Sequence, residues 1–289
     1  MIKMRNLHSE VKNLVYGMML GDVVFVNGDL GDDTATGESY EYAKKSLAGA
    51  VQNVVSGHHD YILCVGAETG AAAVAITQAD LHIIGVGNGG MMNAWNRGYQ
   101  YTCPAADALQ PSTAADGLEL AGIKFFTAAG QLVVDDAGAD GMFFHHNTFT
   151  TAADTTTDNT DVTLDIEGKY FVCADSIFLR QKLAIDTAGT GAIIERCLFE
   201  ADDAGSKAVN AAGLQTIVRD CIFNLSSSSA AVAITYAAAS DAGAIINCRF
   251  DATINDAISN AGANVLIIDC YSDTITSNTT SVTYTAIND

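Results

Sequence analysis

A sequence motif that returns about every 24 residues limits the possible folds of this chain more than any other feature. Its fullest copies hold a β-branched residue, two variable positions and then Cys-x-Phe, as in "IIERCLF" at 193–199 and "IVRDCIF" at 217–223. Such a repeat indicates one structural turn per copy, with insertions placed in loops. Aligned on their last residue, the copies end at Phe125, Phe149, Phe178, Phe199, Phe223, Phe250 and Ser272, which are 24, 29, 21, 24, 27 and 22 residues apart.

Each copy is expected to contain two short strands separated by a tight turn. Cysteine and phenylalanine two positions apart point to the same side of a strand. The residue before the cysteine is Asp220, Asn247 or Asp269 in three copies, and Asn and Asp tolerate a left-handed backbone. Arg196 stands at the same place in the fourth copy and departs from this rule. Short strands joined by tight turns at this period are typical of a parallel β-helix.

Equivalent side chains of stacked coils should form rows, because successive coils lie about 4.8 Å apart. We expect an inward row of small cysteines, continued by Ser176 and Asn147, beside a row of phenylalanines. Metal binding or redox chemistry is the alternative, but the chain has no Cys-x-x-Cys pair, and a linear row does not converge on one ion. Packing is therefore the preferred role of Cys197, Cys221, Cys248, Cys270, Phe199, Phe223 and Phe250.

Residues 21–70, "GDVVFVNGDLGDDTATGESYEYAKKSLAGAVQNVVSGHHDYILCVGAETG", contain a strand, a Gly/Asp turn, an amphipathic helical pattern and a second strand. This segment resembles the entry of right-handed parallel β-helix proteins of the pectate-lyase-like superfold, and the coils at 115–272 extend the resemblance. It implies an all-β fold, a right-handed parallel β-helix solenoid of about nine coils, with an N-terminal amphipathic capping helix. The apolar stripe of that helix would be Tyr42, Leu47, Val51, Val54 and Val55.

We expect a single domain over residues 1–289. With 49% hydrophobic residues the chain can bury a large core, and its two prolines stand in one region, so that no Pro-rich linker divides it. The expected parts are an N-terminal arm at 1–20, the entry strand and capping helix at 21–60, the coils at 61–275 and a Thr-rich C-terminal arm at 276–289. Both arms are candidates for attachment to a partner.

The chain is strongly acidic, with 34 Asp and Glu against 14 Lys and Arg and a formal net charge of −20. This charge repels phosphate backbones and anionic membrane surfaces, so we expect neither nucleic acid nor a membrane as a partner. No run of 18 apolar residues predicts a membrane span, and "LVYGMML" is too short for a signal peptide. Seven cysteines without a secretion signal favour reduced thiols and folding in a cytoplasm.

The sequence offers little evidence of catalysis. Polygalacturonase-type hydrolases of this superfold carry NTD, DD, GHG and RIK motifs; Asn159-Thr160-Asp161 and Asp202-Asp203 match the first two, and the others are missing. Neighbouring histidines on a strand point to opposite faces, so the pairs 58–59 and 145–146 each offer at most one inward residue. We expect no enzyme activity, no cofactor and no metal. Two polar sets could bind calcium, and the first could also supply a catalytic pair of acids, but both are expected to solvate loops and turns: Glu200, Asn224, Asp251 and Asp273, and Asp29, Asp32, Asp33 and Glu38.

The segment 88–117 breaks the repeat and holds the single tryptophan. Aromatic residues, Met and Arg are enriched at protein contacts. A loop that covers the flank of the coils would use the same residue types, and this interpretation stays open. The residues considered for a partner contact are Met91, Met92, Trp95, Arg97, Tyr99 and Tyr101.

The resemblance extends to compact β-helix proteins of tailed-phage virions, which lack a recognisable catalytic set. It implies a non-enzymatic virion structural protein, most specifically a bacteriophage capsid decoration protein on the head surface, assembled in the host cytoplasm. The implied partners are further copies in a homotrimer and the major capsid protein or another virion protein. The alternative is a polysaccharide-binding or polysaccharide-degrading β-helix, such as a tailspike or depolymerase. Acids and aromatics grouped on consecutive coils would favour that alternative.

Overall fold

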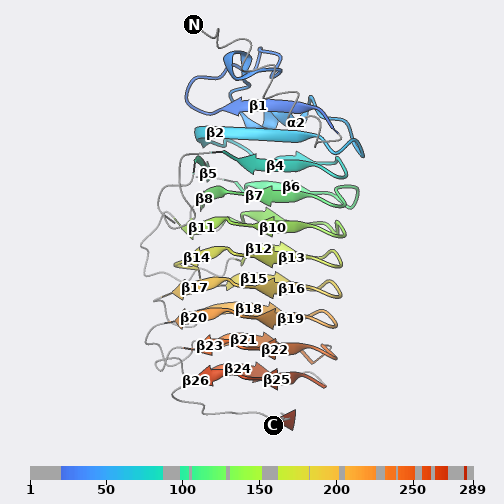
Figure 1. Ribbon diagram of the computed structural model, residues 1–289, viewed down its shortest axis with the longest axis vertical. Helices are drawn as coiled ribbons and strands as arrows, with labels where there is room; N and C mark the ends of the chain where they lie inside the picture. Colours follow the sequence, from blue (N-terminus) through green and yellow to red (C-terminus); the bar gives the residue numbers. More distant parts are fainter. Residues whose placement is uncertain are drawn as a thin grey trace, which may run out of the picture.

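The described chain is a stack of short parallel strands arranged in three sheets along one axis (Figure 1). The computed structural model describes residues 21–86, 98–103, 106–127, 131–151, 162–181, 183–201, 206–225, 232–238, 240–250, 256–261, 264–272 and 283–284. Every strand pairing within these residues is parallel, which gives an all-β parallel β-helix. The number of coils and their handedness stay predictions.

Sheet A runs the length of the stack, and β2 (Tyr61–Thr69) continues from it into sheet B. Sheet A contains β1 (Val23–Asn27), β2, β4 (His82–Gly85), β7 (Glu119–Ala121), β10 (Phe143–His145), β13 (Val172–Ala174), β16 (Ile193–Glu195), β19 (Ile217–Arg219), β22 (Ala244–Ile246), β25 (Leu266–Ile268) and β27 (Thr283–Tyr284).

Sheets B and C complete the three-sided cross-section. Sheet B contains β5 (Tyr99–Cys103), β8 (Ile123–Thr127), β11 (Thr148–Thr151), β14 (Ile177–Leu179), β17 (Leu198–Ala201), β20 (Ile222–Leu225), β23 (Arg249–Phe250) and β26 (Tyr271–Ser272). Sheet C contains β3 (Val74–Ile76), β6 (Leu109–Pro111), β9 (Val134–Asp135), β12 (Val162–Ile166), β15 (Leu183–Thr187), β18 (Lys207–Ala211), β21 (Val232–Tyr236) and β24 (Asp256–Asn260).

A single left-handed residue turns the chain from sheet A into sheet B. Asp220, Asn247 and Asp269 have φ of 55°, 50° and 51°, as their residue types predicted, and Arg196 adopts the same conformation at 52°. The turned backbone directs its amide along the stack, where it meets the next coil. The amide of Arg196 donates to the carbonyl of Arg219 at 3.1 Å, and that of Asp220 donates to Ile246 at 3.0 Å.

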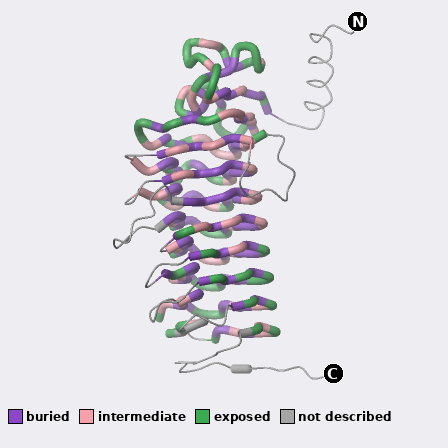
Figure 2. Tube along the Cα trace, turned by 90° about the vertical axis from the view of Figure 1, so that its left-hand side faces the viewer, coloured by how far each residue is buried: buried purple, intermediate pink, exposed green. Residues whose placement is uncertain are grey.

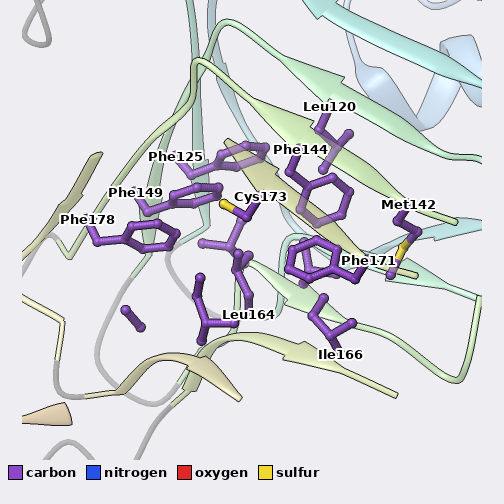
Figure 3. Close-up of a cluster of buried hydrophobic side chains, with 14 of the residues drawn as sticks. Leu120, Phe125, Met142, Phe144, Phe149, Leu164, Ile166, Phe171, Cys173 and Phe178 are labelled. Carbon is purple, nitrogen blue, oxygen red and sulfur yellow. The ribbon is translucent and has the colours of Figure 1, made fainter. Parts of the chain in front are cut away.

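The interior of the solenoid is filled by rows of like side chains (Figure 3). The phenylalanine rings stack nearly parallel, with centroids 4.8 Å apart for Phe178 and Phe199 and 5.0 Å apart for Phe199 and Phe223 and for Phe223 and Phe250. Offset stacks of this kind add to the apolar burial that drives folding. Beside them lie the buried thiols of Cys197, Cys221 and Cys248, and the half-buried thiol of Cys270.

The N-terminal end is covered differently from the prediction. Helix α2 (Leu47–Val51) has five residues, begins at the cap Ser46 and buries its Leu and Val. Tyr42 belongs to the short 3-10 helix η1 (Tyr40–Tyr42), and Val55 follows α2, so the expected continuous stripe is interrupted. Both side chains are exposed, at 62% and 60%. The predicted N-terminal amphipathic capping helix, with a stripe from Tyr42 to Val55, is therefore not confirmed.

The two ends of the chain are described unequally. Residues 1–20 lie outside the described residues, and of the expected C-terminal arm the structure describes β27, which pairs with β25 through Leu266–Thr283 and Ile267–Tyr284. Exposed positions concentrate in the loops at the β1 end and along the corners of the coils (Figure 2). Among the described residues, no helix has the length and apolarity needed to cross a membrane.

Candidate functional site

The outer face of sheet A carries a group of polar side chains near the β1 end. Residues of a strand alternate between core and surface. In later coils the first outward position of sheet A holds an apolar residue such as Val172 or Ile193, and the second holds Ala174, Glu195 or Arg219. In β4 and β7 the first outward position holds His82 and Glu119, and in β10 the second holds His145. We call His82, Glu119, His145 and the adjacent His146 the Glu119 cluster.

The carboxylate of Glu119 is shared by two imidazoles. Its Oε2 lies 2.5 Å from Nδ1 of His82, and its Oε1 lies 2.7 Å from Nε2 of His145. The three side chains are 18 to 23% exposed, so the carboxylate is largely screened from water but reachable. The hydrogen bonds from His145 and His82 lower the pKa of Glu119 to about 2. The carboxylate is therefore ionised at neutral pH and accepts both bonds.

The second nitrogen of His145 extends this arrangement to His146. Their Nδ1 atoms lie 2.8 Å apart. Because a neutral His145 donates from Nε2 to Glu119, its Nδ1 carries the lone pair and accepts from Nδ1 of His146. The result is a relay from Glu119 through His145 to His146. Such a carboxylate–imidazole chain fixes a tautomer and stabilises a positive charge that forms on the histidines.

Aromatic rings hold the imidazoles in place. Tyr61 stacks on His82 with ring centroids 4.3 Å apart, and Phe143 stacks on His145 at 4.4 Å. Phe143 is 39% exposed, so part of its ring is open to solvent on the coil next to Glu119. An exposed ring next to convergent polar groups is a usual element of a site that binds an organic ligand.

A second charged group continues along the same side of the stack. The guanidinium of Arg196 binds both carboxylate oxygens of Asp175 at 2.8 Å, and it also contacts Glu195 at 2.5 Å. Arg219 binds the other oxygen of Glu195 at 2.6 Å. The bond from Arg196 lowers the pKa of Asp175. Charged and polar groups therefore follow one another from β4 to β19 on the outside of sheet A.

The described residues contain one further group with metal-ligand types, namely Asp22, His58 and Asp60. The carboxylate of Asp60 is already engaged, since it accepts the amides of Asp22 and Val55 at 2.7 Å each and lies 2.7 Å from Nδ1 of His58. These contacts fasten the entry of the chain to the loop after α2. We assign the group this structural role.

The predicted partner contact is placed differently by the structure. Met91, Met92, Trp95 and Arg97 lie outside the described residues. Tyr99 and Tyr101 are buried, because the alternation of β5 directs both inward, and they do not form a surface contact. The ring of Tyr101 lies 6.2 Å from Phe125 at the head of the phenylalanine row, and the hydroxyl of Tyr99 donates to buried Glu68.

The remaining candidates are partly described. Glu200 and Asn224 face each other on neighbouring exposed positions of sheet B, while Asp251 and Asp273 lie outside the described residues. The same holds for 159–161 and 202–203. Asp33 accepts the backbone amides of Lys45 and Ser46, as a turn residue does. None of the histidines at 58, 59, 145 and 146 is buried in the core.

The Glu119 cluster was not predicted from the sequence, because two of its members, His82 and Glu119, stand outside the clearly aligned copies of the repeat. His82 precedes the aligned copies, and Glu119 stands in the weakest of them, "ADGLELAGIKF" at 115–125. A usable signal did exist. In β4 and β7, His82 and Glu119 stand at the register position that holds Ile193 and Ile217 in the Cys-containing copies.

No protein-family model matches the chain, and no curated protein matches it. Among solved structures, it is similar to a pectin methylesterase from Aspergillus niger, with a TM-score of 0.55, 10% identity and coverage of 91% of this chain and 90% of the other. It is also similar to the cedar pollen allergen jun a 1, with a TM-score of 0.50, 10% identity and coverage of 92% of this chain and 82% of the allergen. A lacto-N-biosidase from Eubacterium ramulus is similar with a TM-score of 0.53 and 11% identity. That match covers 92% of this chain and 57% of the length of the lacto-N-biosidase. At these identities the likeness shows the fold alone, a parallel β-helix of the pectate-lyase-like kind.

Proposed function

We propose that this protein binds a polysaccharide along the outer face of sheet A and cleaves or de-esterifies it by acid–base chemistry at the Glu119 cluster. The proposal rests on one observation. An ionised carboxylate, two imidazoles bound to it and the exposed ring of Phe143 occur together on consecutive coils. An acid and aromatic rings grouped on consecutive coils favour a glycan-acting β-helix over a purely structural one.

The chemistry follows from the tautomers in the relay. In this relay the imidazole pair of His145 and His146 is the general base that takes up a proton from an attacking water. The positive charge that results lies on the two imidazoles and is stabilised by Glu119, 2.7 Å from Nε2 of His145. Glu119 itself, with a pKa of about 2, cannot act as a general acid near neutral pH. It orients the histidines and compensates their charge.

The charge of the protein selects the substrate class. At a net charge of −20, the protein as a whole repels an anionic polymer and does not repel a neutral one. We therefore propose a neutral polysaccharide, with Phe143 packing against a sugar ring and the flanking charged groups binding hydroxyls. The solved structures named pectin methylesterase and lacto-N-biosidase share the fold, and the choice of substrate here rests on charge.

The test is a screen of neutral and uronic-acid polysaccharides for newly formed reducing ends and for released acyl groups. We expect activity on a neutral polymer and a loss of about 100-fold or more in Glu119→Gln and in His146→Ala, the range typical of general acid–base groups. Glu200→Gln, which removes the same charge from an exposed position of sheet B, should keep full activity. Equal rates in Glu119→Gln and the wild type would overturn the role of the cluster, and inactivity and non-binding on every polymer would overturn the function.

A second candidate is the virion surface protein implied by the sequence resemblance, as a homotrimer bound to a capsid protein. The observation that favours it is an outward row on sheet B in which Ile222 and Tyr271 are exposed, with Arg249 between them. Tyr and Arg are enriched at protein contacts, and an exposed Ile beside them adds apolar area to such a surface. Purified protein should then sediment as a trimer and bind DNA-free capsids, and Ile222→Asp should weaken both. A monomer that ignores capsids would contradict this candidate.

A further inference from the structure

The described residues give the Glu119 cluster a base but no carboxylic acid that can donate a proton. Cleavage of a glycosidic bond normally uses two carboxyl groups, one of which protonates the leaving oxygen. Among the described strands, the outer face of sheet A holds two carboxylates, Glu119 and Glu195. Glu119 accepts hydrogen bonds from two imidazoles, and its pKa of about 2 keeps it ionised. Glu119 therefore cannot supply the proton.

The second carboxylate of this face is too distant to act with the first. Strands β7, with Glu119, and β16, with Glu195, are separated by three coil-to-coil steps, or about 14 Å at about 4.8 Å per step. Both carboxylates lean toward the next later coil, Glu119 to His145 and Glu195 to Arg219, so this separation is kept. Glycosidases hold their two carboxyl groups about 5 to 9.5 Å apart.

The charged group beside the cluster and the acidic row of sheet C do not supply an acid either. Asp175, at the left-handed turn after β13, is bound through both oxygens by Arg196 at 2.8 Å, and this contact lowers its pKa. Asp165, whose pKa is raised to about 6, stands on the outside of sheet C, a different side of the solenoid. The described outer face of sheet A therefore offers a base without a protonated carboxyl group.

Hydrolysis of an ester has other requirements than hydrolysis of a glycoside. Water attacks the ester carbonyl once a base removes its proton. The leaving alcohol needs only the proton that the base has gained, and an imidazole oriented by an ionised carboxylate performs both steps. His145, with its Nε2 2.7 Å from Glu119 and its Nδ1 2.8 Å from Nδ1 of His146, provides this arrangement.

An apolar surface begins beside the cluster. The first outward position of sheet A changes from Glu119 to Phe143, Val172 and Ile193 on the next three coils. All three apolar side chains are partly open to solvent. Val172 lies one coil beyond His145, so a carbonyl group held at the imidazole would direct a short alkyl chain onto Val172 and Ile193. Contact between apolar groups at this place favours an acyl group that carries methylenes.

We propose that the Glu119 cluster hydrolyses O-acyl esters carried by a neutral polysaccharide. This inference rests on the polysaccharide function proposed above and selects ester hydrolysis from its two reactions. Water adds to the acyl carbonyl carbon while the imidazole pair of His145 and His146 takes the proton of the water. The tetrahedral intermediate then expels the sugar oxygen, which receives that proton. One C–O bond forms and one breaks, and the products are a polymer hydroxyl group and a carboxylic acid.

The charge of the protein distinguishes O-acyl esters from the methyl esters of uronic acids. Hydrolysis of a methyl ester leaves a carboxylate on the polymer, so a protein with a net charge of −20 repels the polymer more after each turnover. Hydrolysis of an O-acyl ester leaves the polymer neutral, and the negative charge departs with the small acid. Successive turnovers along one polymer therefore favour the O-acyl ester.

The test uses the full-length protein and O-acetylated glucomannan in water enriched in ¹⁸O, with methyl-esterified homogalacturonan as the second polymer. We expect release of acetate that carries ¹⁸O from the solvent, and no new reducing ends. Glu119→Gln and His145→Ala should lower the rate of acetate release about 100-fold or more. Glu200→Gln, at an exposed position of sheet B, should keep the full rate. Thermal unfolding shows whether each variant is folded.

The length of the acyl chain tests the apolar surface. The kcat/KM for butyryl esters of the same polymer should exceed that for acetyl esters by about fourfold or more, since each buried methylene contributes up to about fourfold. Val172→Ser should remove most of this preference. Ile177→Ser, which replaces an outward aliphatic residue of sheet B, is the matched control and should keep it. The same preference in Val172→Ser and the wild type would overturn the place assigned to the acyl chain.

The products separate this inference from the function on which it rests. New reducing ends without acetate, lost in Glu119→Gln, would overturn ester hydrolysis and uphold the polysaccharide function. Methanol from homogalacturonan without acetate from glucomannan would overturn the O-acyl assignment, and ¹⁸O in the polymer instead of the acetate would overturn attack at the carbonyl carbon. Absence of every product would overturn the inference, and absence of polymer binding as well would overturn the function.

Discussion

The thiol of Cys197 lies 3.3 Å from the carbonyl oxygen of Glu195, two residues earlier in the same coil. Cys221 and Cys248 make the same contact with Arg219 and Ile246, at 3.2 and 3.4 Å. In the coil that has a serine at this position, Ser176 donates to Ala174 at 2.9 Å. In these coils the position after the left-handed turn therefore holds a small side chain that donates a hydrogen bond to the last carbonyl of the sheet A strand, whereas Asn147, at the same position, donates to Leu120 of the preceding coil at 2.8 Å.

This hydrogen bond predicts an order of stability for substitutions of Cys197. Cys197→Ser should cost less than about 1 kcal/mol, because its hydroxyl can bind Glu195 as Ser176 binds Ala174. Cys197→Ala should cost about 1 kcal/mol through the lost donor, and Cys197→Leu about 1–3 kcal/mol through overpacking of a dense interior. Denaturant unfolding of the three variants measures the order. A serine variant less stable than the leucine variant would refute the donor role.

The same burial predicts unreactive thiols. Burial raises the pKa of Cys197 well above its usual value, and the hydrogen bond with Cys221 raises that of Cys248 to about 12. Thiolates, not thiols, react with disulfide reagents. The hydrogen bond with Cys248 raises the pKa of Cys270 as well, so the thiols differ in solvent access and not in ionisation. In native protein at pH 8, a chromogenic disulfide should label the half-buried Cys270 before the buried Cys197 and Cys248, which should stay unmodified until unfolding. Rapid native labelling of Cys197 would contradict the closed interior.

Three carboxylates stack in register on the outside of sheet C, Asp135 beside Asp165 and Asp165 beside Asp186. Desolvation, with the nearby charges of Asp186, Glu167, Asp135 and Asp136, raises the pKa of Asp165 to about 6. The folded state then holds this proton more tightly than the unfolded state. The resulting stability is complete below about pH 4 and is lost as the pH rises through about 6.

Replacing the carboxyl group of Asp165 by an amide should remove the loss of stability that its ionisation causes. Asp165→Asn should match the wild type near pH 4 and exceed its unfolding free energy at pH 7 by about 1 kcal/mol, once solvent screening of a half-exposed site is allowed for. Urea unfolding at both pH values gives the difference. Asn210→Asp, which would lengthen the carboxylate row next to Asp186, should act in the opposite direction. A pH-independent effect of Asp165→Asn would show that the repulsion is absent.

The left-handed turn gives a further test. Asn247 has a φ of 50°, where a β-branched side chain is strained. Asn247→Val should cost about 1–2 kcal/mol, while Asn247→Gly should change stability by less than about 1 kcal/mol. Asn224→Val, at an exposed position within β20, is the matched control and should be neutral or stabilising. Equal losses of stability in Asn224→Val and Asn247→Val would show that the left-handed conformation of Asn247 is not the cause of its loss.

The fold could be predicted from the sequence because every coil needs the same turn conformation and the same row packing, so the same residue types recur in each copy. Backbone conformation requires a turn residue just before Cys221 and Cys248, and row packing favours a phenylalanine two positions after each cysteine. Both features can be recognised in a single sequence. The Glu119 cluster could not be recognised in this way. It joins residues 37 and 26 positions apart, whose contact depends on the lengths of the intervening loops and on register between coils.

The pH dependence of the unfolding free energy tests the contribution of the Glu119 cluster to stability. In the folded protein the pKa of Glu119 is about 2, below its usual value of 4.5, so the stabilisation that its ionised form provides is complete above about pH 4.5 and is lost as the pH falls through about 2. At pH 6, Glu119→Gln should reduce the unfolding free energy by about 2 kcal/mol, and near pH 2 the variant and the wild type should converge. Glu200→Gln, at an exposed position, should differ little from the wild type at either pH. Guanidinium unfolding curves at pH 2, 4 and 6 measure all three proteins, and a loss in Glu119→Gln that persists at pH 2 would mean that the glutamine fails sterically rather than by loss of charge.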